Sequence, residues 1–458
     1  MPHAARAAAD MEHEAGPVVP PPVGDQTRSS NRLPLVVSAS NPMSRVVAEA
    51  DEQPVGSASS SSPAGHRSVP RRKLRVVLLQ TQAEGAGAQE ISRILGRGLE
   101  RRGYDVHHLF LYRRTSAYDE QPNTHFCARE PVDGLLNLAR MARTLLSRLR
   151  QLRPDAVVCF QHYGNLAGAV AARLCNVRAV IANRTTSLKL TPRLAWLLEH
   201  VFGITGLFDR MVVNCRTIAD EYRGSLAAYR AKVVRIDHGF EPKLSSLDRN
   251  AARRELDLPA DGTLLGSVGR LHPGKNLGAA VALLPLQPEW RLALVGQGPA
   301  RAELLRLAAS LGVEGRLHLL GELPPDRVGV FLRALDVFVF PSSAESFGLA
   351  AVEAAQAGLP IVANNLDVLR EVLAFEGRPC ALFVEASDAA DFARGVHHIL
   401  AEHDLRDALT SSGKRLSERY SLEAMVERYD RLIRDLVAST ESADSQGAHI
   451  PPQTPLAS

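Results

Sequence analysis

The 458-residue sequence has little of several features that would each point to a class of protein. Aromatic residues make up only 5% of it and no nucleic-acid-binding motif is present, so we do not expect it to bind DNA or RNA. Its five cysteines form no C-x-x-C pair and no His/Cys spacing typical of a metal site, which predicts reduced, mostly buried thiols in the cytoplasm. The nearest approach to a membrane span, residues 190–208, is interrupted by Arg193, Glu199 and His200.

Positive charge is concentrated in one half of the chain, although the net charge is only +4. Between Arg71 and Arg210 there are 22 lysines and arginines against 11 aspartates and glutamates. A predicted helix over 135–153 carries a series of arginines, namely Arg140, Arg143, Arg148, Arg150 and Arg153. This series indicates either a solvated helix face or peripheral contact with an anionic membrane or a pyrophosphate-linked lipid.

Both ends of the chain differ in composition from the rest. Residues 1–72 and 438–458 are rich in Ala, Pro, Ser and Gly and lack an apolar period, so we predict disordered tails. The first residues, "MPHAARAAADMEHEAGPVVPPP", have no apolar core of a secretory signal. The fold is therefore expected within 73–437.

Strand-like and helix-like segments alternate twice along this region. "KLRVVLLQ" begins the first series, which occupies 73–245, and "TLLGSVGRL" begins the second, over 246–437. In the second series we expect a helix over 277–286, and an amphipathic helix that begins at Leu422 crosses over at the end. This pattern predicts an α/β protein with two doubly wound, parallel-sheet, Rossmann-like domains that face each other across a cleft.

The stretch "SSAESFGLAAVEAAQAGLPIVA" (342–363) holds two glutamates eight positions apart. A strand ends at Pro341, and a helix is expected from about Phe347-Gly348 to Gly358. Its N-terminus would attract a phosphate, whereas carboxylates accept hydrogen bonds from hydroxyls. A nucleotide sugar, with a diphosphate in its middle and hydroxyl-rich rings at both ends, would suit Glu345 and Glu353.

A diphosphate beside two carboxylates needs positive charge, and "GRLHPGKN" supplies it. Arg270 follows a predicted strand, and Lys275 lies five residues further on in a Pro-Gly turn. Arginine offers a planar fork to phosphate oxygens, and lysine offers a compact charge. The turn "VGQGP" (295–299) contains glycines that suit a close backbone approach or a plain β-turn.

Taken together, these segments resemble the retaining, GT-B-fold glycosyltransferases of family 4. The resemblance rests on E-x7-E at Glu345 and Glu353 and on "GRLHPGKNL", "LVGQGP", "LHLLGEL", "DVFVFPSSAESFG" and "EAAQAGLPIVA", in family order over about 264–363. It implies that Arg270 and Lys275 bind the donor diphosphate, that Glu345 contacts the donor sugar and that Glu353 holds the ribose. The remaining donor-binding positions that it implies are Ser346, Phe347, Gly348 and Leu349 at the phosphates, and Gly321 and Glu322 near the base. Two positions depart from the usual pattern, Ser346 in place of Gly and Ala350 in place of a frequent Pro.

The first half resembles the acceptor domain of that family more loosely. "GAGAQEISRILGRGLERRGYDV" is similar to its glycine-rich loop and helix, with Gly87 retained near the donor or acceptor. Where many relatives have a histidine that touches the donor sugar, this chain has Asn183 and Arg184, either of which could supply hydrogen bonds. His162, at another strand end, is a further candidate, although a lone histidine is more often non-catalytic.

The sequence thus predicts a cytoplasmic retaining glycosyltransferase that moves a sugar from a nucleoside diphosphate to a glycan, a lipid-linked acceptor or a small molecule. It needs no cofactor beyond this co-substrate, and the absence of an Asp-x-Asp near a strand end gives no reason to expect a metal. The alternatives are a nucleotide-sugar epimerase of the same architecture and a non-catalytic nucleotide-sugar-binding protein.

Overall fold

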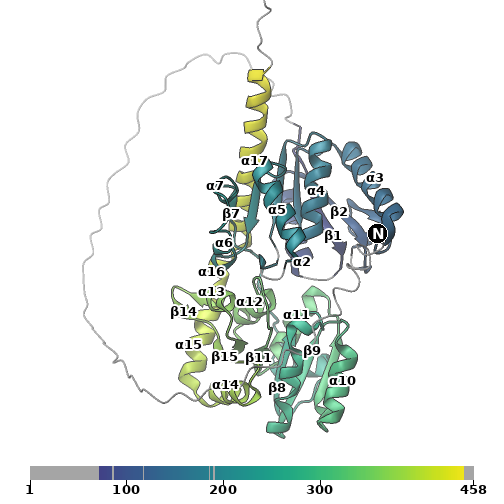
Figure 1. Cartoon of the computed structure of the whole chain (residues 1–458). Coiled ribbons are helices and arrows are strands. Elements are labelled where there is room, and N and C mark those ends of the chain that lie inside the picture. Colours follow the sequence, from purple (N-terminus) through teal and green to yellow (C-terminus); the bar gives the residue numbers. More distant parts are fainter. Residues whose placement is uncertain (1–71, 85–86, 117, 185, 189–190, 448–458) are drawn as a thin grey trace, which may run out of the picture. The chain divides into compact units, whose positions relative to one another are not determined.

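The computed structural model describes residues 72–84, 87–116, 118–184, 186–188 and 191–447 (Figure 1). The predicted N-terminal tail therefore lies outside the described residues, apart from Arg72. The predicted C-terminal tail was placed too early, because the last helix, α17 (Leu422–Gly447), continues for ten residues beyond Val437. Within the described chain, no helix combines the length and apolarity that a membrane crossing needs.

The first sheet has seven strands, all parallel, in the order β3-β2-β1-β4-β5-β6-β7. Its strands are β1 (Arg75–Ala83), β2 (Asp105–Arg113), β3 (Thr124–Ala128), β4 (Ala156–Phe160), β5 (Ala179–Asn183), β6 (Arg210–Val213) and β7 (Val233–Arg235). The central strands β4 and β5 are buried at every position, which explains why they read as continuous apolar runs rather than as alternating ones.

Helices cover both faces of this sheet. They are α2 (Gly87–Arg101), α3 (Gly134–Leu152), α4 (His162–Leu174), α5 (Arg193–Thr205), α6 (Arg216–Asp220) and α7 (Ala227–Arg230). The crossover from β1 through α2 to β2 runs along the sheet in one direction, and those through α3, α4 and α5 run in the other. Right-handed crossovers therefore put α2 on one face and α3, α4 and α5 on the other. On that second face α4 packs against both α3 and α5, so the three form one layer (Figure 1).

The second sheet has six parallel strands in the order β10-β9-β8-β11-β12-β15. Its strands are β8 (Thr263–Val268), β9 (Trp290–Val295), β10 (Leu317–Gly321), β11 (Val337–Phe340), β12 (Ile361–Asn364) and β15 (Leu382–Val384); β13 (Ala374–Phe375) and β14 (Arg378–Pro379) form a separate antiparallel pair. Its helices are α8 (Arg249–Glu255), η2 (Pro273–Lys275), α9 (Leu277–Val281), η3 (Leu284–Leu286), α10 (Arg301–Ser310), η4 (Glu314–Arg316), α11 (Pro325–Ala334), α12 (Leu349–Gln356), α13 (Asp367–Val372), α14 (Ala389–Ala401), α15 (His403–Lys414) and α16 (Leu416–Arg419). Two doubly wound parallel sheets confirm the predicted fold class.

The prediction of a helix over 277–286 is wrong in its length. The α-helix α9 ends at Val281, and the chain continues as the 3-10 turn η3. Pro285 lies within that turn, and a proline has no N–H with which to continue an α-helix.

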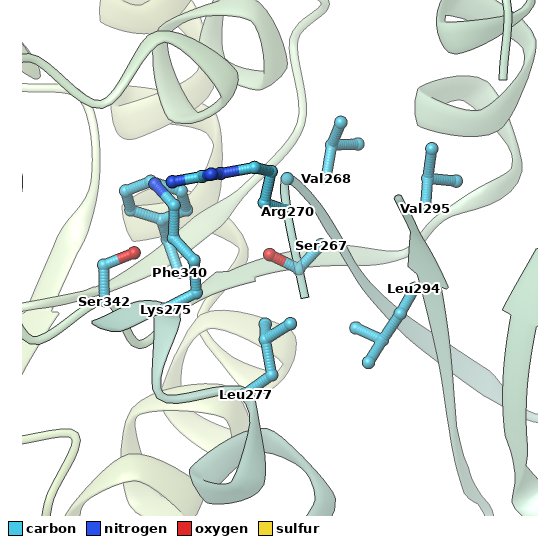
Figure 2. Close-up of a pocket in the computed structure, with 10 residues that line it drawn as sticks. Ser267, Val268, Arg270, Lys275, Leu277, Leu294, Val295, Phe340 and Ser342 are labelled. Atoms are coloured by element: carbon cyan, nitrogen blue, oxygen red, sulfur yellow. The ribbon is translucent and has the colours of Figure 1, made fainter. Parts of the chain in front are cut away.

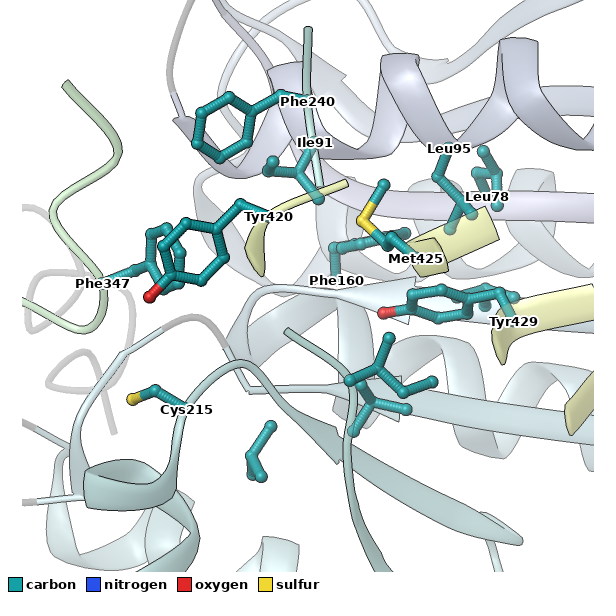
Figure 3. Close-up of a cluster of buried hydrophobic side chains, with 14 of the residues drawn as sticks. Leu78, Ile91, Leu95, Phe160, Cys215, Phe240, Phe347, Tyr420, Met425 and Tyr429 are labelled. Atoms are coloured by element: carbon teal, nitrogen blue, oxygen red, sulfur yellow. The ribbon is translucent and has the colours of Figure 1, made fainter. Parts of the chain in front are cut away.

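Two chain segments cross between the sheets side by side. The Phe240 amide donates to the Tyr420 carbonyl at 3.2 Å, and the Gly239 amide lies 3.1 Å from the Met425 sulfur. The rings of Phe240 and Tyr420 stack 6.3 Å apart (Figure 3). After this crossing, α17 packs on α2 and on β5, so it helps α2 to cover one face of the first sheet.

We predict that Gly98 in α2 is required for this cover. A Cβ atom at Gly98 would lie 2.3 Å from the Val426 Cγ2 of α17, so Gly98→Leu overfills the contact and should reduce stability by about 1–3 kcal/mol. Glu100→Leu, on the exposed side of the same helix, is the matched control and should change stability by less than about 0.5 kcal/mol. Urea unfolding of both variants measures this, and equal midpoints would contradict the packing.

Candidate functional site

The loop that follows β8 carries two cations into one pocket. Val268 ends β8, Arg270 follows after Gly269, and Lys275 is the last residue of the 3-10 turn η2. Ser267, Arg270, Lys275, Phe340 and Ser342 all line this pocket (Figure 2). The Lys275 amine lies 5.5 Å from the centre of the Phe340 ring, which favours a cation at this point.

A buried hydroxyl in the same pocket is not satisfied. Ser342 follows β11 and is almost wholly buried, yet its Oγ atom has no hydrogen-bond partner in the described chain. A buried polar atom of this kind is a position where a ligand oxygen would be stabilised. The pocket thus offers two cations and one free hydroxyl.

Each cation faces a carboxylate. Lys275 Nζ lies 2.5 Å from Glu345 Oε1, and Arg270 Nη1 lies 3.7 Å from Glu84 Oε1. Arg114 also approaches Glu84, at 3.6 Å. The Lys275 and Arg270 side chains are 30% and 43% exposed, whereas those of Glu345 and Glu84 are 9% and 10% exposed. The cations are therefore the more accessible members of these pairs.

The helix α12 begins beside these residues. Its N-cap is Gly348, whose φ of +85° is unfavourable for other residues. A Cβ atom there would also lie 2.6 Å from Leu369 Cδ2, so both backbone conformation and space require glycine. No acidic residue occupies the first turn, which leaves the positive end of the helix dipole unopposed by the helix itself.

The loop before α12 is held from the first sheet as well. The Cys215 thiol donates to the Ser346 carbonyl at 3.6 Å. The Phe347 ring packs edge-on against Tyr420, with a centroid distance of 5.2 Å (Figure 3). It also packs edge-on against His238, at 4.9 Å. Gly87, at the start of α2, has its missing Cβ position 3.7 Å from Leu349 Cδ2. The start of α2 therefore lies against the start of α12.

Glu353, in the middle of α12, is a buried carboxylate with one cationic partner. Its residue is only 4% exposed, and its Oε1 lies 2.7 Å from Lys243 Nζ. Burial raises the pKa of Glu353 above its ordinary value of 4.5, and Lys243 opposes that rise. Glu345, in contrast, is only partly buried. The two glutamates therefore occupy different environments.

Sequence reasoning missed Lys243 and Glu84. Lys243 lies in the segment between β7 and α8, where "EPKLSS" carries no motif, and it meets Glu353 only through the fold. Glu84 directly follows β1 and meets Arg270, which follows β8 in the other half of the chain. No local spacing signals either contact.

The turns near Gly321 are packed backbone to backbone. The Gly296 amide donates to the Gly321 carbonyl at 2.7 Å. Cβ atoms at Gly296 and Gly298 would lie 2.0 and 2.3 Å from the carbonyl oxygens of Gly269 and Leu271. The glycines of "VGQGP" therefore allow close packing of the loop that holds Arg270. Beyond this packed turn, Glu322 is exposed.

Asn183 and Arg184, either of which was expected to supply hydrogen bonds to the sugar, both have partners within the chain. Asn183 Oδ1 accepts from the Tyr429 hydroxyl, and its Nδ2 donates to the Cys159 carbonyl at 3.0 Å. Arg184 is buried, forms an ion pair with Glu199 and donates to Thr191. Both residues also line a pocket with Asn214 and His238, so their contact with the sugar stays a prediction.

His162 remains available by comparison. Both of its ring nitrogens lack a hydrogen-bond partner among the described residues, and burial lowers its pKa below 6.5. It begins α4, one residue after Gln161, whose φ of +63° is uncommon for a side-chain-bearing residue. Among the described residues, no group of three or more His, Cys, Asp or Glu side chains could hold a metal ion.

Comparison with known proteins agrees with this arrangement. The family described as Glycosyl transferases group 1 matches residues 248–416, and the family described as Glycosyltransferase Family 4 matches residues 86–244. Among curated proteins, the D-inositol 3-phosphate glycosyltransferase of Acidothermus cellulolyticus is 33% identical over 253 residues, 52% of this chain and 56% of that protein. The enzyme of the same name from Corynebacterium urealyticum is 29% identical over 254 residues, 52% of this chain and 59% of that protein. The chain thus spans a little over half the length of these two relatives.

Solved structures share the fold at low sequence identity. Sucrose-phosphate synthase from Thermosynechococcus elongatus superposes with a TM-score of 0.67 at 20% identity, over 80% of this chain and all of that one. Anabaena HepE in complex with UDP-glucose gives a TM-score of 0.66 at 18% identity, over 81% of this chain and all of that one. Two family matches in tandem, each on one of the two sheets, show that the chain belongs to the GT-B-fold glycosyltransferases of family 4.

Proposed function

We propose that this chain is a retaining glycosyltransferase that uses a nucleoside diphosphate sugar as its donor. The observation that carries the proposal is the pocket at the carboxyl end of β8, where Arg270, Lys275 and the free Ser342 hydroxyl converge beside the start of α12. Two cations, a hydroxyl and a helix N-terminus together suit a diphosphate.

Binding of the donor exchanges carboxylates for phosphates. In the chain by itself, Glu345 and Glu84 neutralise Lys275 and Arg270. A diphosphate brings more negative charge than either carboxylate and accepts from both cations and from helix amides. Once released from Lys275, Glu345 remains next to the diphosphate site and accepts hydrogen bonds from the sugar hydroxyls.

Glu353 is proposed to hold the ribose. Its carboxylate is buried and oriented by Lys243, so it presents a fixed acceptor to vicinal hydroxyls. A pre-oriented charged acceptor forms the stronger class of hydrogen bond. Gly321 and Glu322, at the end of β10, are proposed to lie near the base.

Transfer with retention is proposed to occur on one face of the sugar. The bond from C1 to the leaving phosphate oxygen breaks while the bond to the acceptor oxygen forms on the same side. The acceptor hydroxyl gives its proton to the leaving diphosphate, whose growing negative charge is stabilised by Arg270, Lys275 and the α12 amides. No covalent enzyme intermediate is required by this route.

The acceptor is proposed to be a glycan, a lipid-linked molecule or a small molecule bound on the first-sheet side. The curated relatives are named for an inositol phosphate acceptor, which makes a phosphorylated polyol one compound to test. We also propose that the enzyme works in the cytoplasm at an anionic membrane surface. The excess of lysine and arginine between residues 71 and 210 supports this location.

We predict that Arg270→Ala and Lys275→Ala each reduce donor turnover at least tenfold, about 1.4 kcal/mol of transition-state stabilisation, and leave the fold intact. Donor consumption, with UDP-glucose as the first donor tried, measures the effect. Arg301→Ala, which removes an exposed arginine of α10, is the matched control and should behave as wild type. Wild-type rates in both pocket variants would refute the diphosphate site.

We predict different losses for the two glutamates. Glu353→Gln keeps the shape but loses a charge-assisted bond worth about 1.5–3 kcal/mol, so it should weaken binding of the free nucleoside diphosphate and of the full donor alike. Glu345→Gln should bind the free nucleoside diphosphate as well as wild type and transfer sugar poorly. Calorimetric titration separates the two cases; equal, large losses of diphosphate affinity would contradict the assigned roles.

A pH series tests whether burial perturbs the titration of Glu353. Because burial raises the pKa of Glu353, its contribution to stability is full below about pH 4 and is lost as pH rises through the folded-state pKa. Glu353→Gln does not titrate. The unfolding free energy of wild type relative to this variant should therefore fall as the pH rises from about pH 4 through the raised folded-state pKa. A difference that is constant with pH would show that burial does not perturb this group.

A further inference from the structure

The helix α5 buries two polar residues and exposes most of its large apolar ones, which is the reverse of an ordinary surface helix. Its buried residues are Ala195, Glu199, His200 and Gly203. Its exposed residues include most of its large apolar side chains, namely Leu194, Trp196, Leu197, Leu198, Val201 and Ile204. An exposed apolar patch of this size on one helix marks a surface that meets an apolar partner.

Specific contacts hold α5 in this orientation. Glu199 accepts hydrogen bonds at 2.9 Å from the hydroxyls of both Tyr222 and Tyr229 and is paired with Arg184. The ring of Tyr229 packs so closely that a Cβ atom at Gly203 would lie 2.4 Å from it. Rotating the leucines inward would turn Glu199 outward and leave the buried Arg184 without its ion-pair partner. The apolar side therefore stays on the outside.

The length of α5 excludes a transmembrane role for this helix. Thirteen residues extend about 20 Å at 1.5 Å per residue, which is short of the ~30 Å hydrocarbon core of a bilayer. A short helix with one apolar face suits the boundary between headgroups and acyl chains instead.

Neighbouring helices add apolar and basic groups on the same layer. Val170 and Leu174 of α4 are exposed, as are Leu135, Leu136 and Leu138 at the start of α3. The arginines of α3 complete this layer, and none of them pairs with a carboxylate of the described chain: Arg140, Arg143, Arg148 and Arg150 lie in the helix, and Arg153 lies at its C-cap. Unpaired arginines beside exposed leucines match an anionic lipid surface in charge as well as in polarity.

We infer that α5 is a membrane-insertion element whose apolar side enters the outer acyl region of an anionic bilayer, while the α3 arginines contact phosphate headgroups. This inference rests on the proposed membrane location and adds the surface that makes the contact. It does not depend on which sugar is transferred.

The two tryptophans of the chain provide the test. Trp196 lies on α5 and is 42% exposed, whereas Trp290 is 1% exposed in the core of the second sheet. In the full-length chain carrying Trp290→Phe, fluorescence reports on Trp196 alone. Vesicles of equal parts phosphatidylcholine and phosphatidylglycerol should shift its emission to the blue, and brominated acyl chains should quench it. Vesicles of phosphatidylcholine alone should have a much smaller effect.

Matched variants connect the signal to the surface. Leu194→Glu and Leu197→Glu should each reduce the vesicle-bound fraction at sub-saturating lipid at least tenfold. Leu305→Glu, at a leucine of α10 that is 40% exposed, should bind vesicles as wild type does. Arg140→Glu with Arg143→Glu should weaken binding at low salt and reduce its salt dependence.

The remaining outcomes separate the inference from the proposed location. Salt-sensitive vesicle binding without quenching of Trp196 would overturn the role of α5 and leave the membrane location standing. Absence of binding to anionic vesicles would overturn both. Sedimentation that shows a dimer dissociated by Leu197→Glu, together with absence of vesicle binding, would show that a second copy covers α5 and would refute the inference.

Discussion

The ion pair between Lys243 and Glu353 is the interaction on which the arrangement of the site depends. A carboxylate inside a helix as apolar as α12 is costly unless it is paired, and its only cationic partner in the described chain is Lys243. Lys243 belongs to the segment that joins the two sheets, so the pair connects this segment to α12. The same helix begins at Gly348 and contacts Gly87 of the first half. One buried pair thus aligns elements from both halves of the chain.

Charge balance explains how the pocket can be both stable and ready to bind. Arg270 and Lys275 lie in one pocket, where mutual repulsion would be unfavourable without Glu84 and Glu345. We propose that a diphosphate replaces these carboxylates at the two cations. Glu345 would then accept from the sugar, and Glu84 would keep its contact with Arg114.

The sequence predicted the elements whose signals are local. The run "VFVFPSSAESFGLAAVE" combines a buried strand, a turn and a glycine before a helix, and all three appear where they were expected. Parallel sheets followed from continuous apolar strands such as β4. The predicted length of α9 was too great because the apolar run included Pro285. The helix α17 continues beyond Val437, where the apolar periodicity of the sequence ends.

The missed features are those that only tertiary structure creates. Lys243 and Glu84 meet their partners across many residues of sequence, so no motif reveals them. Asn183 and Arg184 occupy a position that suggests ligand contact, and the structure adds a hydrogen bond from Tyr429 to Asn183 and an ion pair between Arg184 and Glu199. In α5, the apolar residues suggest the buried side, but the pairing of Glu199 with Arg184 decides the orientation.

The central claim is that the pocket at the end of β8 binds a nucleoside diphosphate sugar for transfer. A panel of nucleotide sugars screened by thermal unfolding tests it most directly, because a ligand that binds only the folded chain raises the unfolding temperature. Mass analysis of the reaction with glycan, lipid and polyol phosphate acceptors then follows the stabilising donor. We predict that at least one nucleotide sugar stabilises the chain, that its free nucleoside diphosphate does so too, and that an acceptor gains the mass of one sugar. A chain that is stabilised by no nucleotide sugar and no nucleoside diphosphate would contradict this account.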